Sequence, residues 1–158
     1  MKILIKGGRV VDPKNDFDKV ADVLVDNGVI SEIGENINVD GDVTVIDAEG
    51  KIVSPGLVDM HSHLRDPGQE YKEDIESGTR SAAMGGITSI ACMPNTKPVT
   101  DSEPIVTYIK TKAKEVGHVN VYPIGSISKG LEGKELAEIG ELKNAGAVAI
   151  SDDGRPVV

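Results

Sequence analysis

Two histidines, His61 and His63, are the residues in this chain whose type and spacing best suit metal chemistry. They end the run GLVDMHSH at positions 56–63, which has the apolar character of a strand. Alternate residues of a strand point to the same side, so the two imidazoles should project together, about 6 to 7 Å apart. At that separation both can reach one divalent ion. The spacing predicts half of a metal site, although an isolated H-x-H also fits two polar residues at a strand end.

Further polar residues follow other apolar runs. Asp152 and Asp153 come directly after residues 147–151. A turn is the simpler interpretation of the pair, since Asp-Gly is a turn signal, but one of these acids could ligate or bridge metal ions while the other supports the loop, and the residues alone leave open which does what. The guanidinium of Arg65 suits two-point binding of a carboxylate, and the amide of Asn95 can hydrogen-bond the same group. A surface ion pair for Arg65 and a turn for Asn95 are the simpler alternatives.

These side chains need a scaffold, and strand and helix patterns alternate from residue 56 onward. Apolar runs predict strands at 56–63, 87–93, 119–125 and 147–151, and the spacing between them predicts helices at 71–84, 101–116 and 133–145. This alternation is typical of βαβ units with a parallel sheet. The first strand ends in His-Ser-His instead of a Gly-rich phosphate loop, which disfavours a doubly wound nucleotide-binding fold.

A (β/α)8 TIM barrel explains the polar strand ends, because barrel active sites lie at the carboxyl ends of the strands. Four strands make half of such a barrel, which needs about 250 residues in all. The expected fold class is therefore α/β, with residues 55–158 forming the first four strands of a truncated barrel. Residues 1–54 predict a small, all-β, sandwich-like subdomain. Gly7-Gly8 is expected to form a turn there, and Asn27-Gly28 a hairpin.

Composition narrows the classes of partner. The net charge is -9 and no basic stripe runs along any segment, which argues against nucleic acid or an anionic membrane. The N-terminal run MKILIKGGRVVD is expected to be neither a signal peptide nor a membrane span. The single cysteine, Cys92, fits a reducing cytoplasm and is expected to be a buried hydrophobe. His118 precedes the third strand, so it should lie at the opposite end of the barrel from the metal site.

The run PGLVDMHSHLRDPGQEYKEDIESGTRSAAMGGITSIACMPNTKPVTD, residues 55–101, resembles bacterial dihydroorotases of the amidohydrolase superfamily. The resemblance implies reversible cyclisation of N-carbamoyl-aspartate to dihydroorotate in pyrimidine synthesis. It also implies one or two zinc ions held by His61, His63 and Asp153, with Asp153 as a bridge in place of a carboxylated lysine. His63, Arg65 and Asn95 would bind the substrate.

In that family, the aspartate that transfers the proton and further histidine ligands lie beyond residue 158. The resemblance therefore implies that the catalytic base is outside this chain and that the chain alone is inactive. Possible partners are a second copy of the chain and aspartate transcarbamoylase.

Two alternative functions stay open. One is a sister amidohydrolase acting on a hydantoin, dihydropyrimidine or allantoin, whose neutral rings would leave Arg65 unpaired. The other is a catalytically dead scaffold, against which the retained ligands count. An accidental H-x-H in an ordinary α/β domain is the remaining reading.

Overall fold

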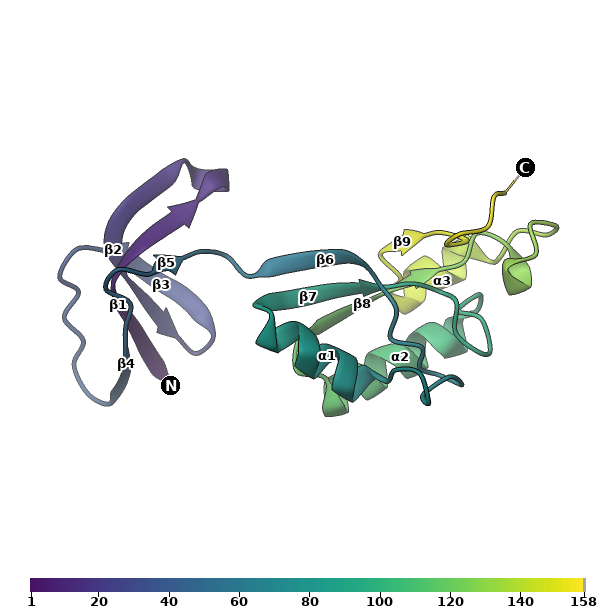
Figure 1. The fold of residues 1–158 in the computed structure, drawn as a ribbon, viewed down its shortest axis with the longest axis horizontal. Helices are drawn as coiled ribbons and strands as arrows, with labels where there is room; N and C mark the ends of the chain where they lie inside the picture. Colours follow the sequence, from purple (N-terminus) through teal and green to yellow (C-terminus); the bar gives the residue numbers. More distant parts are fainter. Residues whose placement is uncertain (158) are drawn as a thin grey trace. The chain divides into compact units, whose positions relative to one another are not determined.

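A computed structural model describes residues 1–157 of the chain. They form two compact units, Met1–Pro55 and Gly56–Val158. The first unit is a β-sheet, and the second is an α/β unit in which helices follow parallel strands (Figure 1). The expected fold class is confirmed: part of a parallel barrel follows a separate β unit.

The first unit is a five-stranded sheet built on its longest strand. Its elements are β1 (Lys2–Asp12), the short 3-10 helix η1 (Pro13–Asn15), β2 (Phe17–Asp26), β3 (Val29–Gly34), β4 (Val43–Asp47) and β5 (Ile52–Val53). The strand order is β3-β2-β1-β4, and β5 also pairs with β1. The pairs β1–β2 and β2–β3 are antiparallel, whereas β4 and β5 run parallel to β1. Its small core is formed by Val10, Ala21 and Val23.

One turn prediction in this unit holds and the other is wrong. Asn27 and Gly28 both have positive φ, 50° and 81°, as the hairpin between β2 and β3 requires. Gly7-Gly8 is not a turn, because β1 continues through it with a shift of register against β2. Gly7 takes a φ of 72°, and its N–H donates to the buried Asp22 carboxylate at 2.9 Å. The glycine thus forms a bulge that bends the strand without ending it.

The second unit is a four-stranded parallel sheet in the order β6-β7-β8-β9. Its elements are β6 (Leu57–Ser62), α1 (Ile75–Met84), β7 (Ile87–Cys92), α2 (Glu103–Val116), β8 (Asn120–Gly125), the 3-10 helix η2 (Lys129–Leu131), α3 (Ile139–Ala145) and β9 (Ala149–Ile150). In Figure 1, α1 and α2 lie along the same face of this sheet. Each helix therefore returns the chain to the start of the next strand, as in a barrel.

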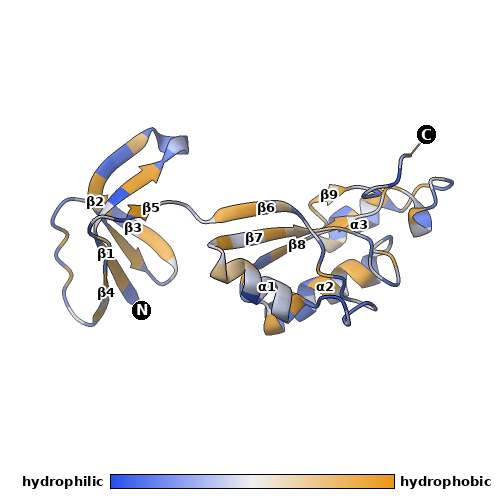
Figure 2. Ribbon diagram, viewed as in Figure 1, coloured by the Kyte–Doolittle hydropathy of each residue, from blue (hydrophilic) through white to orange (hydrophobic). Residues whose placement is uncertain are grey.

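Aliphatic side chains hold the helices on the sheet. Ile75 of α1, Ile90 and Cys92 of β7, and Ile109 of α2 form one buried cluster. Figure 2 shows hydrophobic colouring concentrated along these parallel strands. A second cluster joins Val106 of α2 to Leu142 of α3, so α2 packs on two sides. Burying each such side chain contributes about 1.5–3 kcal/mol, which makes α2 the central support of the unit.

Two helices begin later than the sequence predicts. The first starts at Ile75 rather than residue 71, because the Asp74 carboxylate caps it by accepting from the Ser77 N–H at 2.7 Å. The third starts at Ile139 rather than 133. The residues expected to form its first turns instead make backbone hydrogen bonds to the loop before them. The Lys129 N–H donates to the Glu135 carbonyl, and the Ala137 N–H donates to the Ile127 carbonyl, each at 2.8 Å. These bonds to the preceding loop occupy backbone groups that a helix would need.

The parallel sheet has two outer strands. Within the described residues β9 pairs only with β8, and β6 pairs only with β7. The strand β6 exposes Leu57, Val58 and Met60, the last with 77% of its surface accessible. Within the described residues, both outer strands of the partial barrel therefore have an open edge. No helix in residues 1–157 has the length and apolar character needed to cross a membrane.

Candidate metal centre

The structure brings His61, His63 and Asp153 together at the carboxyl ends of the strands. The two imidazole rings lie 5.2 Å apart between centroids. One carboxylate oxygen of Asp153, Oδ1, is 3.2 Å from Nε2 of His61 and 4.0 Å from Nε2 of His63. Within residues 1–157 this is the one cluster of three potential ligands, with their donor atoms all within 4.8 Å of one another.

These residues come from the two outer strands of the sheet. His61 lies in β6, His63 follows that strand, and Asp153 lies just beyond β9. In a flat sheet the first and fourth strands would be roughly 14 Å apart. The bend of a partial barrel and a turn after β9 close this distance. In that turn Asp153 has a positive φ of 56°, and Arg155 N–H donates to Asp152 O at 3.1 Å.

Asn95, which follows β7, links two members of the cluster. Its side-chain oxygen lies 3.0 Å from His63 Nδ1, and its amide nitrogen donates to Asp153 Oδ2 at 2.7 Å. This arrangement assigns the proton of a neutral His63 to Nδ1 and leaves the lone pair of Nε2 free. It also turns the other oxygen of Asp153 toward the histidines. Outer groups that orient ligands in this way are a regular part of metal sites.

The neighbouring acids Asp152 and Asp153 have opposite surroundings. Asp152 is buried and accepts from the N–H groups of Ile127 and Ser128, at 2.7 and 3.0 Å, and from the Ser128 hydroxyl. Burial alone would raise the pKa of Asp152, but these bonds outweigh it and the pKa is lowered. Asp152 therefore holds the loop after β8, whereas Asp153 faces the histidines. The geometry therefore brings Asp153, and not Asp152, beside the two histidines.

A cleft of about 400 Å³ adjoins the cluster. Arg65, Asn95 and Asp153 line it together, and so do Gln69 and Arg155. The backbone of Arg65 is left-handed, with a φ of 58°, and its guanidinium lies 3.5 Å from the Asn95 carbonyl. A carboxylate group entering this cleft would meet at least one cationic side chain beside the candidate ligand Asp153.

Sequence analysis missed Gln69 and Arg155 as cleft residues. Gln69 donates from its side chain to the Asn95 carbonyl at 3.3 Å, and Arg155 donates to the Leu131 carbonyl at 2.8 Å. A signal for Arg155 was present, since it follows Asp153 by two residues just as Arg65 follows His63. Nothing in the local pattern around Gln69 distinguishes it from an ordinary loop residue.

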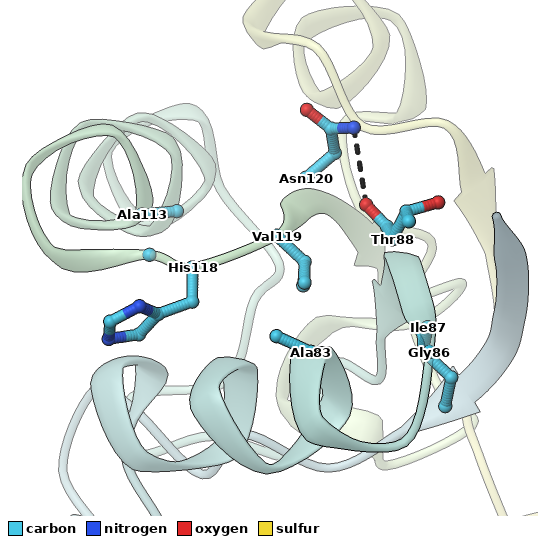
Figure 3. A pocket seen from close by; sticks show the side chains of 9 residues that line it. Ala83, Gly86, Ile87, Thr88, Ala113, His118, Val119 and Asn120 are labelled. Carbon is cyan, nitrogen blue, oxygen red and sulfur yellow. Dashed lines mark hydrogen bonds between the residues drawn. The ribbon is translucent and has the colours of Figure 1, made fainter. Parts of the chain in front are cut away.

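A larger cavity, of about 510 Å³, lies at the amino ends of β7 and β8, away from the cluster. His118 and Asn120 line it, and Asn120 donates to the Thr88 carbonyl at 3.2 Å (Figure 3). Figure 3 shows the His118 ring directed away from Asn120 and Thr88. No carboxylate lines this cavity, so His118 has no partner there for a metal site.

The donor set at the cluster fits a divalent zinc-type ion. Imidazole nitrogens and a carboxylate oxygen are the usual ligands of catalytic zinc, at about 2.0–2.2 Å. Two ligands of a tetrahedral ion then lie about 3.3 Å apart, and the two measured contacts to Asp153, 3.2 and 4.0 Å, are close to that spacing. Three protein ligands also leave room for a substrate or water molecule.

Comparison with known proteins agrees with this geometry. A model of the dihydro-orotase-like family matches residues 50–158. A dihydroorotase from Acetivibrio thermocellus is 67% identical over 156 residues, which cover 98% of this chain and 36% of that protein. A dihydroorotase from Geobacter sulfurreducens is 60% identical and is covered to 37%. The chain thus spans little more than a third of the length of these relatives.

Solved structures of hydantoinases have the same fold. An L-hydantoinase (dihydropyrimidinase) from Arthrobacter aurescens superposes with a TM-score of 0.81 at 32% sequence identity, covering 94% of this chain and 32% of that one. A D-hydantoinase from a Thermus species gives a TM-score of 0.69 at 30% identity. The two matches cover 94% and 90% of this chain.

Proposed function

This chain belongs to the dihydro-orotase-like family, and on that premise we propose that it forms the metal- and carboxylate-binding part of a dihydroorotase. The reaction would be the reversible cyclisation of N-carbamoyl-aspartate to dihydroorotate. The observation that carries this proposal is the position of Arg65 in the same cleft as Asp153 and Asn95. A metal cluster beside a fixed guanidinium suits a cyclic amide that also bears a carboxylate.

We assign His61, His63 and Asp153 as ligands of one or two zinc ions. Bound there, zinc would act as a Lewis acid that polarises a carbonyl oxygen and makes water more acidic. The chain's own task is to hold the ligands in place. Asn95 keeps His63 with its proton on Nδ1 and keeps Oδ1 of Asp153 directed to the imidazoles. Asp153 is the proposed bridge for a second ion, in place of a carboxylated lysine.

Substrate binding is assigned to His63, Arg65 and Asn95. The Arg65 guanidinium would take the substrate carboxylate in two-point contact. The Asn95 amide has two N–H bonds, and only one of them is used by Asp153. The other can therefore donate to the same carboxylate while Asn95 still supports the metal ligands.

The structural likeness to hydantoinases favours one competing substrate class, the neutral cyclic amides. A neutral ring would leave Arg65 without an anionic partner in the cleft, at a cost in desolvation. The higher identity to dihydroorotases and the presence of Arg65 both support an anionic substrate.

The test uses the completed protein, meaning this chain joined to the further segment that accounts for the rest of the relatives' length. Zinc content and hydrolysis of dihydroorotate and of hydantoin are measured for the parent, His61→Ala and Arg65→Ala. We expect His61→Ala to lower zinc content and both activities. Arg65→Ala should keep zinc and lose at least about 2 kcal/mol of transition-state binding for dihydroorotate only.

Two results would count against the proposal. Turnover of hydantoin but not of dihydroorotate would assign the chain to the neutral-ring class. Absence of zinc from the parent would favour a scaffold without catalytic activity. The 158-residue chain by itself, which lacks the proton-transferring base of the proposed mechanism, should show no dihydroorotase activity, and turnover by it would place that base within residues 1–158.

Partners and location belong to the same proposal. We propose that the protein acts on a small molecule in the cytoplasm, where the thiol of Cys92 would stay reduced. Self-association and binding to aspartate transcarbamoylase are the proposed protein contacts, and both rest on the family alone. Size measurement of the completed protein, with and without the transcarbamoylase, tests them.

A further inference from the structure

Asp66, the residue after Arg65, is a buried acid outside the cleft. Its side chain has no exposed surface, and it does not line the cleft beside the metal cluster. A carboxylate with no access to water needs compensating partners, because the charge loses its hydration. The partners of Asp66 therefore show what the loop after β6 is attached to.

The Ile75 N–H at the start of α1 donates to Asp66 Oδ2 at 3.5 Å, and the two side-chain partners lie one turn apart on α2. Lys112 Nζ is 2.6 Å from Asp66 Oδ2, and the Tyr108 hydroxyl donates to Oδ1 at 3.0 Å. Lys112 also donates to the Tyr108 oxygen at 3.3 Å, so the three side chains form one network. The hydrogen bond and charge of Asp66 raise the pKa of Lys112 well above its usual range. The network thus fastens this loop to the most deeply packed helix of the unit.

The other side of the loop is attached to the segment after β7. Lys97 N–H donates to the Pro67 carbonyl at 2.9 Å, and the Gln69 side chain donates to the Asn95 carbonyl at 3.3 Å. Gly68 approaches that segment so closely that a Cβ there would lie 1.7 Å from Lys97 O. Arg65 is therefore held between two attachments, and its left-handed backbone is enforced by the residues around it.

The network also removes a competitor for the guanidinium. Both oxygens of Asp66 are engaged by groups of α2, so this carboxylate is neutralised by Lys112 rather than by its chain neighbour Arg65. The guanidinium of Arg65 is then free to face the cleft, where it lies against the Asn95 carbonyl.

We propose that Asp66, through Tyr108 and Lys112, is a positioning residue that holds Arg65 in the orientation needed to bind the substrate carboxylate. This inference rests on the proposed function, because it assumes that Arg65 contacts substrate. Asp66 touches neither substrate nor metal. Its contribution is to fix the guanidinium in advance, so that less freedom is lost on binding.

The test compares Asp66→Asn, Lys112→Met and Tyr108→Phe in the completed protein, each with and without Arg65→Ala. We expect Asp66→Asn to raise KM for dihydroorotate by about tenfold, with kcat within about twofold and zinc content unchanged. On the Arg65→Ala background the same change should raise KM by less than about twofold, because the residue it positions is gone. Tyr108→Phe removes one hydrogen bond and should raise KM by about threefold.

The exposed pair Glu76–Arg80, at 2.7 Å on α1, provides a matched control. Glu76→Gln removes an ion pair of the same type without touching the loop, so KM should not change. If Asp66→Asn does not fold, Tyr108→Phe and Lys112→Met decide the matter, and an unchanged KM in both would overturn the inference. Equal effects of Asp66→Asn with and without Arg65→Ala would also overturn it. If Arg65→Ala itself leaves KM unchanged, the proposed function fails first.

Discussion

Replacing Asn95 by alanine should weaken zinc binding although Asn95 is not itself a ligand. The change removes the 3.0 Å contact to His63 Nδ1 and the 2.7 Å bond to Asp153 Oδ2. His63 then loses the group that keeps its proton away from Nε2, and Asp153 becomes free to rotate. Both ligands must be ordered anew when the ion binds, and that cost appears in the affinity.

The magnitude follows from the two bonds. A hydrogen bond between neutral groups is worth about 0.5–1.5 kcal/mol and one to a charged group about 1.5–3 kcal/mol, part of which water recovers at this partly exposed site. Loss of outer groups of this kind typically reduces metal affinity by about 10- to 100-fold, or ~1.4–2.7 kcal/mol. We expect the Kd for zinc to rise within that range.

The measurement is competition with a chromogenic chelator at neutral pH, on this chain and on the completed protein. His61→Ala shows the loss of a ligand, and Asn120→Ala is the matched control. Asn120 is also an asparagine with a side-chain bond, to the Thr88 carbonyl, but at the opposite ends of the strands (Figure 3). A Kd for Asn95→Ala within about twofold of the parent would refute the reasoning, and so would an equal loss in Asn120→Ala.

Three further predictions concern the scaffold. They are tested by measuring the free energy of unfolding or the rate of thiol modification of the completed protein. Asp74→Ala should cost about 1 kcal/mol at pH 7 and Asp74→Asn much less. Bonds from Ser77 lower the pKa of Asp74, so the charge-dependent part of its contribution is full above the unfolded pKa of about 3.9 and is lost as pH falls through the lower folded pKa; a cost of Asp74→Ala as large at pH 2 as at pH 7 would contradict this. Burial raises the pKa of Cys92 to about 12, so a disulfide reagent at pH 8 should modify it only after denaturation, and rapid reaction of the native protein would contradict this. Gly68→Ala should destabilise by well over 1 kcal/mol, because its φ is 90° and a Cβ would lie 1.7 Å from a backbone oxygen, whereas Gly140→Ala in α3 meets open space and should be neutral or stabilising; equal effects would contradict the strain.

Much of this architecture was predictable from the sequence because its signals are local. Apolar runs of strand length and helical spacing depend on a few neighbouring residues, and the polar residues after each strand predicted the edge at which they meet. Hence His61, His63, Arg65, Asn95 and Asp153 were all placed at the same end of the sheet, where the structure has them. The hairpin at residues 27 and 28 was predictable for the same reason.

What the sequence did not predict depends on contacts between distant segments. The start of α3 moved because residues 127 and 129 bond to residues 135 and 137, a pairing that periodicity does not encode. Which of Asp152 and Asp153 faces the histidines depends on the loop after β8, because N–H groups of that loop donate to the Asp152 carboxylate. The bridging amide of Asn95 and the attachment of Asp66 to α2 likewise join residues more than thirty positions apart.

The distance along the chain between the candidate ligands has a consequence for how the protein folds. His61 is near the start of the α/β unit and Asp153 follows its last strand, about 90 residues later. During synthesis the ion could therefore be held firmly only after the fourth strand has emerged and paired. Once bound, it would act as a cross-link closing a long loop, and such links restrict the unfolded chain by about 4–5 kcal/mol when they are as permanent as a disulfide. Metal capture would thus favour molecules in which these four strands have already paired.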